Sequence, residues 1–569
     1  MKRTTLWGLA LAFSVAVWGC SNNDNNNNVP PDPIPTDPTP EPPKPPEEPP
    51  PPPTEGWVYG RVMNARYPSQ PMELSSLKIS TSTGKTVDPT EGELFFIQLP
   101  LGKEHLLLIE SSTNEFPRTS HRVKAQAGVF TFVELWVLPF ESFVSFDVST
   151  GGTITTWDGA EVVFPADSIN TTGTVTAQLA WLNAADPNHL AAFPGGFRTT
   201  EGELLESFSA IAIEVRDADG KLLNLKEGAK ALATIPVTSK AALSDDIPLW
   251  VYDEEAGLWK EEGMLTGCSS GFCSAELPHL SWWNADVPME VTCLMACVVD
   301  SNNNPVAGVY LKAGGIDYFN FYGGFSGTDG CACLPVRTNS KVEVSGTLYG
   351  GILESVIVNT KNDPLVCGNP EDTKQCTWVS LKATPPKFQA VLHSELLNAD
   401  YDRYYVDLDA HLTGPCPYPV CNEGRFHVYY GNYGSLSAPP FAALNGDYCG
   451  YHSSYQQEIH SPPEIITLSA CSEGTYRYSV VDASPDYGMP ERKAFADMKA
   501  TVTLLLPGGE PLTRSLKESD NPQNHAHWIV GELQCKASCE CTWVDKNTFE
   551  PYETKEKEEK MMCRGIAVQ

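Results

Sequence analysis

The stretch that decides the fold is FSAIAIEV at Phe208–Val215. A second run of the same kind, ATVTLLL, covers Ala500–Leu506. Short runs in which apolar residues alternate with others recur from Trp57 onward, separated by Gly, Asn, Asp and Pro, and no long apolar pattern of helical period accompanies them. This pattern is typical of half-buried strands in sandwiches. We therefore expect an all-β protein made of several β-sandwich modules in tandem.

The length of the chain indicates the number of domains, and its net charge argues against certain partners. A chain of 569 residues predicts about four domains. The 39 Lys and Arg against 71 Asp and Glu give 39 − 71 = −32. Such an acidic balance argues against a nucleic-acid partner and against membrane binding through a basic patch. The hydrophobic content of 41% is enough to build cores.

The N-terminus has the pattern of an export signal. Lys2 and Arg3 precede an apolar run, Leu6–Trp18, which is too short to span a membrane as a mature helix. The run ends in Val-Trp-Gly-Cys at 17–20, which resembles the bacterial lipobox. The alternative is an ordinary secretory signal with a chance cysteine.

The lipobox resemblance implies a signal peptide at residues 1–19 and a lipid on Cys20, whose acyl chains anchor stably. Ser21 stands where the resembling family often has Asp in proteins held at the inner membrane. We therefore expect an outer-membrane lipoprotein facing the periplasm or the exterior. Residues 20–56 read as a linker, because 15 of the 47 prolines lie in Pro30–Pro53. In polyproline geometry that segment reaches roughly 75 Å.

With Cys20 used for lipid, 17 − 1 = 16 cysteines remain, and an even number in an exported chain indicates disulfides. They cluster locally, so we expect most bridges between near neighbours. Zinc is the alternative, above all for the last group, although no C-x-x-C occurs. The clusters are Cys268/Cys273, Cys293/Cys297, Cys331/Cys333, Cys367/Cys376, Cys416/Cys421, Cys449/Cys471 and Cys535/Cys539/Cys541/Cys563.

Residues 57–140 and 287–384 resemble each other in sequence, as two copies of an internal repeat. In the second copy, the Asp300 turn, PVAG at Pro305–Gly308 and TDG at Thr328–Gly330 resemble the carboxypeptidase-regulatory-like module, a small seven-stranded sandwich. The first copy matches loosely. Cysteines stand at strand positions that are usually apolar, so disulfides are expected to substitute for core. The resemblance implies no peptidase, and the zinc motifs of one are absent from the sequence.

Residues 141–286 resemble the β-rich extracellular domain of cartilage intermediate layer protein and its bacterial relatives. The resemblance rests on VFPA at Val163–Ala166, FPGG at Phe193–Gly196, IPLWVYD at Ile247–Asp253 and HLSWWN at His279–Asn284. Remoter relatives end in a His-Phe-Ser strand, and some cut themselves there.

That remoter resemblance implies that the Ser281 hydroxyl attacks the Leu280 carbonyl while His279, two residues away on the same strand face, acts as base. The reaction also needs backbone strain, which a sequence does not reveal. The alternative is a plain closing strand with an inert histidine.

In residues 385–545, VDLDAHL at Val406–Leu412 places Asp407, Asp409 and His411 on one face. With P-E-x-I and G-x-Y-x-Y segments it resembles an uncharacterised bacterial β-sandwich family, which implies no activity.

Oxygen ligands in this module suggest calcium. The candidates are the carboxylates of Asp407, Asp409, Asp447 and Glu464, with the Asn445 amide. The alternative is a solvated face, or one paired with Arg403 and Arg425. His525 and His527 share a face but form a weak metal signal by themselves. Residues 546–569 read as a charged tail.

The sequence predicts a non-enzymatic, lipid-anchored envelope or surface protein with a structural, adhesive or display role. Its expected partners are the membrane, through the lipid, and an envelope or extracellular protein or glycan, without nucleic acid. No phosphate loop or dinucleotide fingerprint occurs in the sequence. Two alternatives are a calcium-dependent module that binds carbohydrate or protein, and a secreted hydrolase of unrecognised type.

Overall fold

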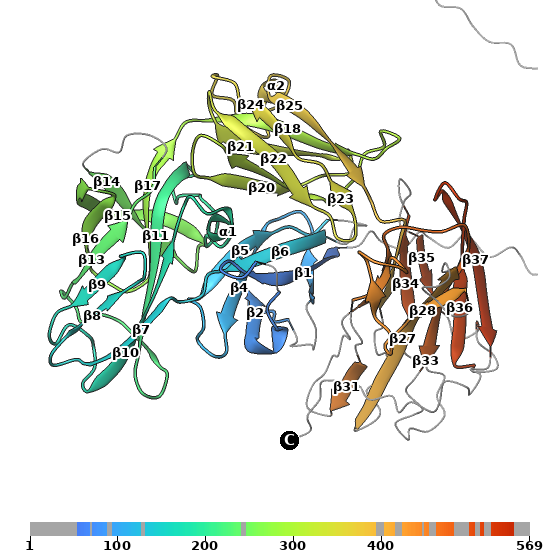
Figure 1. The fold of residues 1–569 in the computed structure, drawn as a ribbon, viewed down its shortest axis with the longest axis horizontal. Helices are drawn as coiled ribbons and strands as arrows, with labels where there is room; N and C mark the ends of the chain where they lie inside the picture. The colour runs from blue at the N-terminus through green and yellow to red at the C-terminus, as the bar shows by residue number, and fades with distance from the viewer. Residues whose placement is uncertain are drawn as a thin grey trace, which may run out of the picture. The chain divides into compact units, whose positions relative to one another are not determined.

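The computed structural model describes residues 54–68, 71–87, 94–126, 131–239, 246–393, 403–415, 424–445, 449–453, 463–482, 500–506, 512–516, 520 and 525–550, without the side chains of 403–407 and 449–453. The predicted signal peptide, Cys20, most of the linker and the tail beyond Glu550 lie outside these residues. Strands dominate what is described, as Figure 1 shows. Two short helices, α1 (Pro187–Ala191) and α2 (Pro370–Thr373), accompany them. The prediction of an all-β chain of tandem sandwich modules is confirmed.

Module 1, strands β1–β6, packs two three-stranded sheets face to face. The sheets are β3 (Phe95–Pro100), β1 (Glu55–Asn64) and β6 (Thr131–Val137), and β2 (Leu77–Thr81), β4 (His105–Ser111) and β5 (Thr119–Val123), with a 3-10 turn η1 at Leu74–Ser76. Alternate residues such as Val58 and Val62 are fully buried between them. The period-two pattern therefore gives each sheet one core-facing side.

Module 3, strands β18–β25, repeats this pairing. In each module the first strand lies between an antiparallel and a parallel neighbour: β1 between β3 and β6, and β18 between β21 and β25. The echo between the two sequence segments is thus present as shared topology. The bounds are β18 (Val291–Val299), β19 (Tyr310–Gly315), β20 (Phe321–Phe325), β21 (Cys331–Arg337), β22 (Lys341–Thr347), β23 (Ile352–Leu353), β24 (Val356–Asn359) and β25 (Thr377–Thr384).

Module 2, strands β7–β17, forms one eleven-stranded sheet with β12 beside β11. Its strands are β7 (Ser142–Asp147), β8 (Gly152–Thr155), β9 (Glu161–Phe164), β10 (Thr174–Leu182), β11 (Leu204–Arg216), β12 (Leu222–Leu223), β13 (Ala231–Pro236), β14 (Ile247–Asp253), β15 (Leu258–Ser269), β16 (Phe272–Leu277) and β17 (Trp282–Met289).

The FSAIAIEV stretch lies inside β11, as predicted, but it is not half-buried. One face, with Ile211 and Ile213, joins the core of module 2, and the other, with Ala210 and Ala212, joins a second core. Small side chains on that second face let large aromatic residues pack against the strand.

Module 4, strands β26–β37, is a sandwich of two six-stranded sheets. One contains β26 (Phe388–His393), β29 (Gly434–Ser435), β30 (Ala442–Leu444), β32 (Glu464–Leu468), β34 (Thr501–Leu505) and β35 (Leu512–Ser515), and the other β27 (Arg403–Pro415), β28 (Arg425–Val428), β31 (Cys449–Ser453), β33 (Gly474–Asp482), β36 (His527–Cys535) and β37 (Cys541–Glu550). The ATVTLLL run becomes β34, with Val502 and Leu504 buried. The last strand reaches Glu550, so the tail expected from residue 546 starts five residues too early.

The modules share packing and belong to one compact unit, Pro53–Gln569. One core joins Leu138 of module 1, Trp250 of module 2 and Phe319 of module 3. Arg337 of module 3 donates to Glu206 of module 2 at 2.8 Å. Contacts of this kind hold neighbouring modules together at their edges.

The expectation of near-neighbour disulfides holds for Cys268–Cys273 and Cys535–Cys541. It fails for the other four described bridges, Cys293–Cys376, Cys297–Cys331, Cys333–Cys367 and Cys471–Cys539. The physical reason is strand pairing, which sets Cys297 directly opposite Cys331. Cys416, Cys421 and Cys563 lie outside the described residues, as does the Cys449 side chain.

The module 3 cysteines do not substitute for core either. Leu294, Ala296 and Val298 of β18 point into the apolar core, while Cys293 lies on the opposite face. There it forms a small separate cluster with Met295, Leu365 and Cys376. The disulfides thus cover the outer face of an intact sandwich.

Candidate functional site

The Leu280–Ser281 bond lies in a bend that precedes β17, not in a strand. The His279 ring packs on Trp283 at 4.7 Å between centroids, and its Nε2 lies 3.5 Å from a Glu262 carboxylate oxygen. Within the described residues, no hydrogen bond joins His279 to the Ser281 hydroxyl. The expected arrangement of hydroxyl and base on one strand face is therefore wrong.

Of the four calcium candidates, the structure describes the side chains of Asp409 and Glu464, and both are buried. The Asp407 side chain and the whole of Asp447 lie outside the described residues. Glu464 accepts a hydrogen bond from the Ala410 N–H at 2.7 Å. Ala410 lies between the part of β27 that pairs with β31 and the part that pairs with β28. The Glu464 carboxylate therefore accepts the hydrogen bond that a neighbouring strand would otherwise accept from this N–H.

His411 has a neighbour that sequence reasoning missed. Its Nδ1 lies 2.9 Å from His427 Nε2, and the His427 ring stacks on Tyr429 at 4.2 Å. Burial, with His427 and His527 nearby, holds the pKa of His411 well below its ordinary value. The alternation of β27 and the Phe-His-Val run of β28 were visible in the sequence, but their register was not.

For the zinc alternative, the sulfurs of Cys471, Cys535 and Cys541 lie within 4.8 Å of one another. These residues take part in two neighbouring disulfides, Cys471–Cys539 and Cys535–Cys541. Disulfide sulfur is not the thiolate that zinc requires. The oxidised cluster therefore does not form a zinc site.

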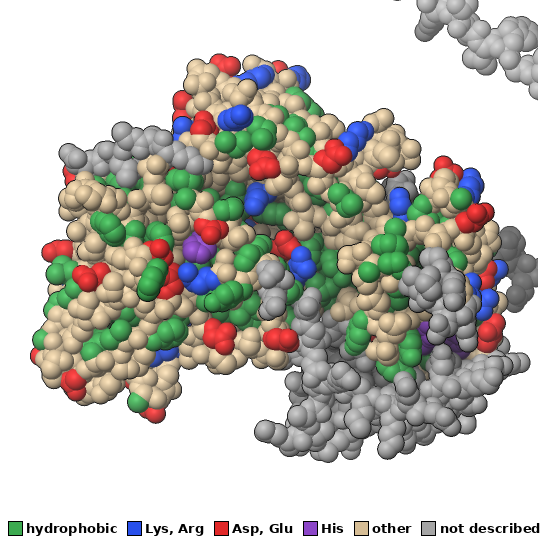
Figure 2. All heavy atoms as spheres, in the orientation of Figure 1, with side chains coloured by type: hydrophobic (Ala, Val, Ile, Leu, Met, Phe, Trp, Pro, Cys, Tyr) green, Lys and Arg blue, Asp and Glu red, His purple; other side chains and the backbone are tan. Residues whose placement is uncertain are grey.

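A cavity of about 740 Å³ is lined by residues of modules 1, 2 and 3, and we call it the three-module cavity. This volume is in the range of small-molecule sites. A recess with charged side chains near it is visible on the face shown in Figure 2. Its aromatic lining comes from all three modules: Trp136, Phe193, Phe197, Tyr310, Phe321, Tyr322 and Phe325.

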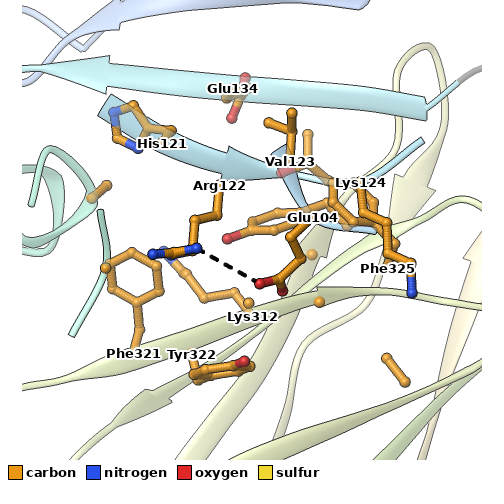
Figure 3. Close-up of a pocket in the computed structure, with 18 of the residues that line it drawn as sticks. Glu104, His121, Arg122, Val123, Lys124, Glu134, Lys312, Phe321, Tyr322 and Phe325 are labelled. Carbon is orange, nitrogen blue, oxygen red and sulfur yellow. Dashed lines mark ion pairs between the residues drawn. The ribbon is translucent and has the colours of Figure 1, made fainter. Parts of the chain in front are cut away.

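Glu104 and two arginines form the polar centre of this cavity. Arg198 lies 3.3 Å from the Glu104 carboxylate and 5.2 Å above the Tyr322 ring. Arg122 of β5 lies 4.0 Å from the same carboxylate, and Figure 3 shows the Arg122 and Glu104 side chains pointing toward each other. Arg122 also donates to the Gly195 and Gly257 carbonyls at 3.2 and 2.8 Å, which fixes its orientation.

Lys312 of β19 enters the cavity beside them, as Figure 3 shows. Its Nζ lies 5.2 Å from the centroid of the Phe321 ring, a cation–π contact. Burial lowers the pKa of Lys312, although the charges of Glu134 and Glu343 act in the opposite direction. Within the described part of the chain, its ammonium has neither an ion pair within 4.0 Å nor a hydrogen bond, and Glu134 is bonded to Arg61 instead.

The cavity walls are held by packing. Phe193 and Phe197 stack at 4.2 Å, and Phe321 meets Phe197 edge-on at 5.5 Å. A Cβ at position 323 would overlap the Tyr310 ring, so the absence of a side chain at Gly323 lets this ring lie against β20. The aromatic and glycine run at Phe321–Phe325 was the one sequence signal for this wall, and it was not singled out.

His121 of β5 stays neutral at the cavity wall. Its Nε2–H donates to the Trp136 carbonyl at 2.7 Å. Burial lowers the pKa of His121 to about 4, against the effect of that hydrogen bond. The positive charge of the cavity therefore comes from arginine and lysine.

No protein-family model and no curated protein matches the chain. Among solved structures it is similar to the full-length major pilin SpaD from Corynebacterium diphtheriae, with 10% identity over 34% of this chain and 61% of that one and a TM-score of 0.16. It is also similar to BcpA, the major pilin subunit of Bacillus cereus, with 9% identity, 58% and 99% coverage and a TM-score of 0.13. The chain thus spans less than two thirds of the SpaD chain.

Proposed function

We propose that this protein is a non-enzymatic lipoprotein of the bacterial outer membrane that binds an envelope or extracellular ligand in the three-module cavity. The observation that carries the proposal is the cavity itself. Aromatic walls and a few oriented polar groups are the usual composition of binding sites. A cavity built by three docked modules is also preorganised, which lowers the free-energy cost of binding.

The anchor in this proposal rests on the sequence. Cys20 closes a lipobox-like segment, and an acidic, proline-rich stalk separates it from the first strand. The described part of the chain contains no candidate membrane-spanning helix. In this proposal a lipid on Cys20 holds the sandwich modules at the envelope, and the stalk keeps the cavity away from the lipid surface.

Adhesion by cells that display the full-length lipoprotein tests this proposal. Phe321→Ala removes an aromatic wall of the cavity and should reduce adhesion to immobilised matrix or envelope components at equal surface abundance. Ile357→Ala is the matched control, because Ile357 is 54% exposed on β24 and does not line the cavity. Equal adhesion by wild type and Phe321→Ala would refute a role for the cavity.

A further inference from the structure

The three-module cavity has a charge opposite to that of the whole chain. Four cationic side chains line it, Arg122, Lys124, Arg198 and Lys312, against the two carboxylates of Glu104 and Glu134, a balance of 4 − 2 = +2. The chain as a whole carries −32. An anionic ligand is therefore repelled by most of the surface and attracted here.

Lys312 and Lys124 are the cationic groups of this lining without an ion pair within 4.0 Å among the described residues, and Lys312 is the more buried of the two. The two arginines share Glu104, and Glu134 is bonded to Arg61 at 2.9 Å. The charges of Glu134 and Glu343 act on Lys312, but neither carboxylate forms an ion pair with it. A largely buried cation of this kind is stabilised when a ligand brings a carboxylate into direct contact with it.

The rest of the cavity matches hydroxyl groups and flat apolar faces. Glu104 offers an acceptor, the Arg198 guanidinium offers donors, and Ser345 and Thr347 add hydroxyls to the lining. Seven aromatic side chains from the three modules form much of the apolar wall. Sugar rings present hydroxyls at the edge and apolar C–H groups on the face, and both have partners here.

From these features we infer that the three-module cavity binds a saccharide that carries a carboxylate, such as a uronic-acid unit, with Lys312 facing the carboxylate. This inference rests on the proposed function and names the ligand class of the same site. Arg198 and Glu104 hold the hydroxyls, and the aromatic walls hold the ring faces.

The test is calorimetric binding of oligogalacturonate to the full-length lipoprotein in detergent, beside the same oligomer with methyl-esterified carboxylates. The wild type should bind the acid form about 10- to 100-fold more tightly, as expected for a hydrogen bond to a charged group. Lys312→Met should abolish that preference and leave binding of the ester unchanged. Lys312→Arg, which keeps the charge, should retain most of it.

Lys341→Met is the matched control, because Lys341 is an exposed lysine of module 3 outside the cavity lining. Equal affinity for acid and ester would overturn carboxylate recognition. Binding of an acidic peptide through Lys312 with no binding of either oligomer would overturn the saccharide class and leave the proposed function standing. If Phe321→Ala also leaves adhesion unchanged, the proposed function itself fails.

Discussion

Removing Arg337 should expose how modules 2 and 3 are held together. Arg337 donates to Glu206 at 2.8 Å, and the two side chains are 31% and 10% exposed. Exposed ion pairs contribute about 0–1 kcal/mol, and breaking a fully buried one costs about 3–5 kcal/mol. This pair lies between these limits, so Arg337→Met should lower the free energy of unfolding by about 2 kcal/mol at pH 7.

The pH dependence of that loss follows from Glu206. Burial raises its pKa above the ordinary value, and Arg337 acts to lower it. A carboxyl group whose pKa is higher in the folded state than in the unfolded state makes the protein less stable as the pH rises. The free energy of unfolding falls between the unfolded pKa and the folded pKa of that group. Without Arg337 the folded pKa rises further, so the cost of the substitution is complete at pH 7 and should largely vanish near pH 4, where Glu206 is protonated.

Urea unfolding of the full-length protein, followed by tryptophan fluorescence at both pH values, measures this cost. Lys230→Met is the control: the Lys230–Glu276 pair is more than half exposed on both sides, so its loss should cost less than about 1 kcal/mol. Glu206→Gln combined with Arg337→Met should cost less than the sum of the single changes. An equal loss at both pH values, or additive costs, would refute the reasoning.

Four further predictions concern other parts of the chain. Cys20→Ser should lose metabolic palmitate label and membrane attachment; label that persists would contradict the anchor. Calcium at 100 times its dissociation constant should stabilise the protein by about 2.7 kcal/mol. EDTA should reverse this stabilisation, and Asp409→Asn should abolish it. A melting temperature that does not change with EDTA would reject the calcium site. Denaturing gels should show one full-length chain with Leu280–Ser281 intact, because the neighbouring histidine packs elsewhere; a cut that Ser281→Ala prevents would show otherwise. Because burial lowers the folded pKa of His121 to about 4, its contribution to stability is lost as the pH falls below about 6.5, by about 3 kcal/mol in total, and His121→Gln should flatten that part of the pH profile.

What the sequence could predict was set by local periodicity. Alternation of apolar residues correctly predicted strands at Phe208–Val215 and Ala500–Leu506. The sequence similarity between the first and third modules corresponds to a shared topology, in which β1 pairs in parallel with β6 and β18 pairs in parallel with β25. Alternation cannot tell whether the second face of a strand meets water or another core, so the double burial of β11 was missed.

The disulfides and the cavity depend on contacts between distant segments. Cys293 pairs with Cys376, 83 residues away, because strand pairing and not chain proximity brings them together. The three-module cavity brings Glu104, Arg198 and Lys312 together from three different modules. No motif joins such residues in the sequence, and only the docking of the modules places them around one space.

The preformed three-module cavity is the central claim, and a distance measurement between modules 1 and 3 tests it most directly. Spin labels on non-natural residues at the exposed positions Lys103 and Lys341 avoid the disulfide cysteines. Pulsed electron–electron double resonance on the full-length protein without ligand should give one narrow distribution of the distance between the two labels. A broad or multiple distribution would show that the modules move independently, and would contradict a cavity that exists before its ligand binds.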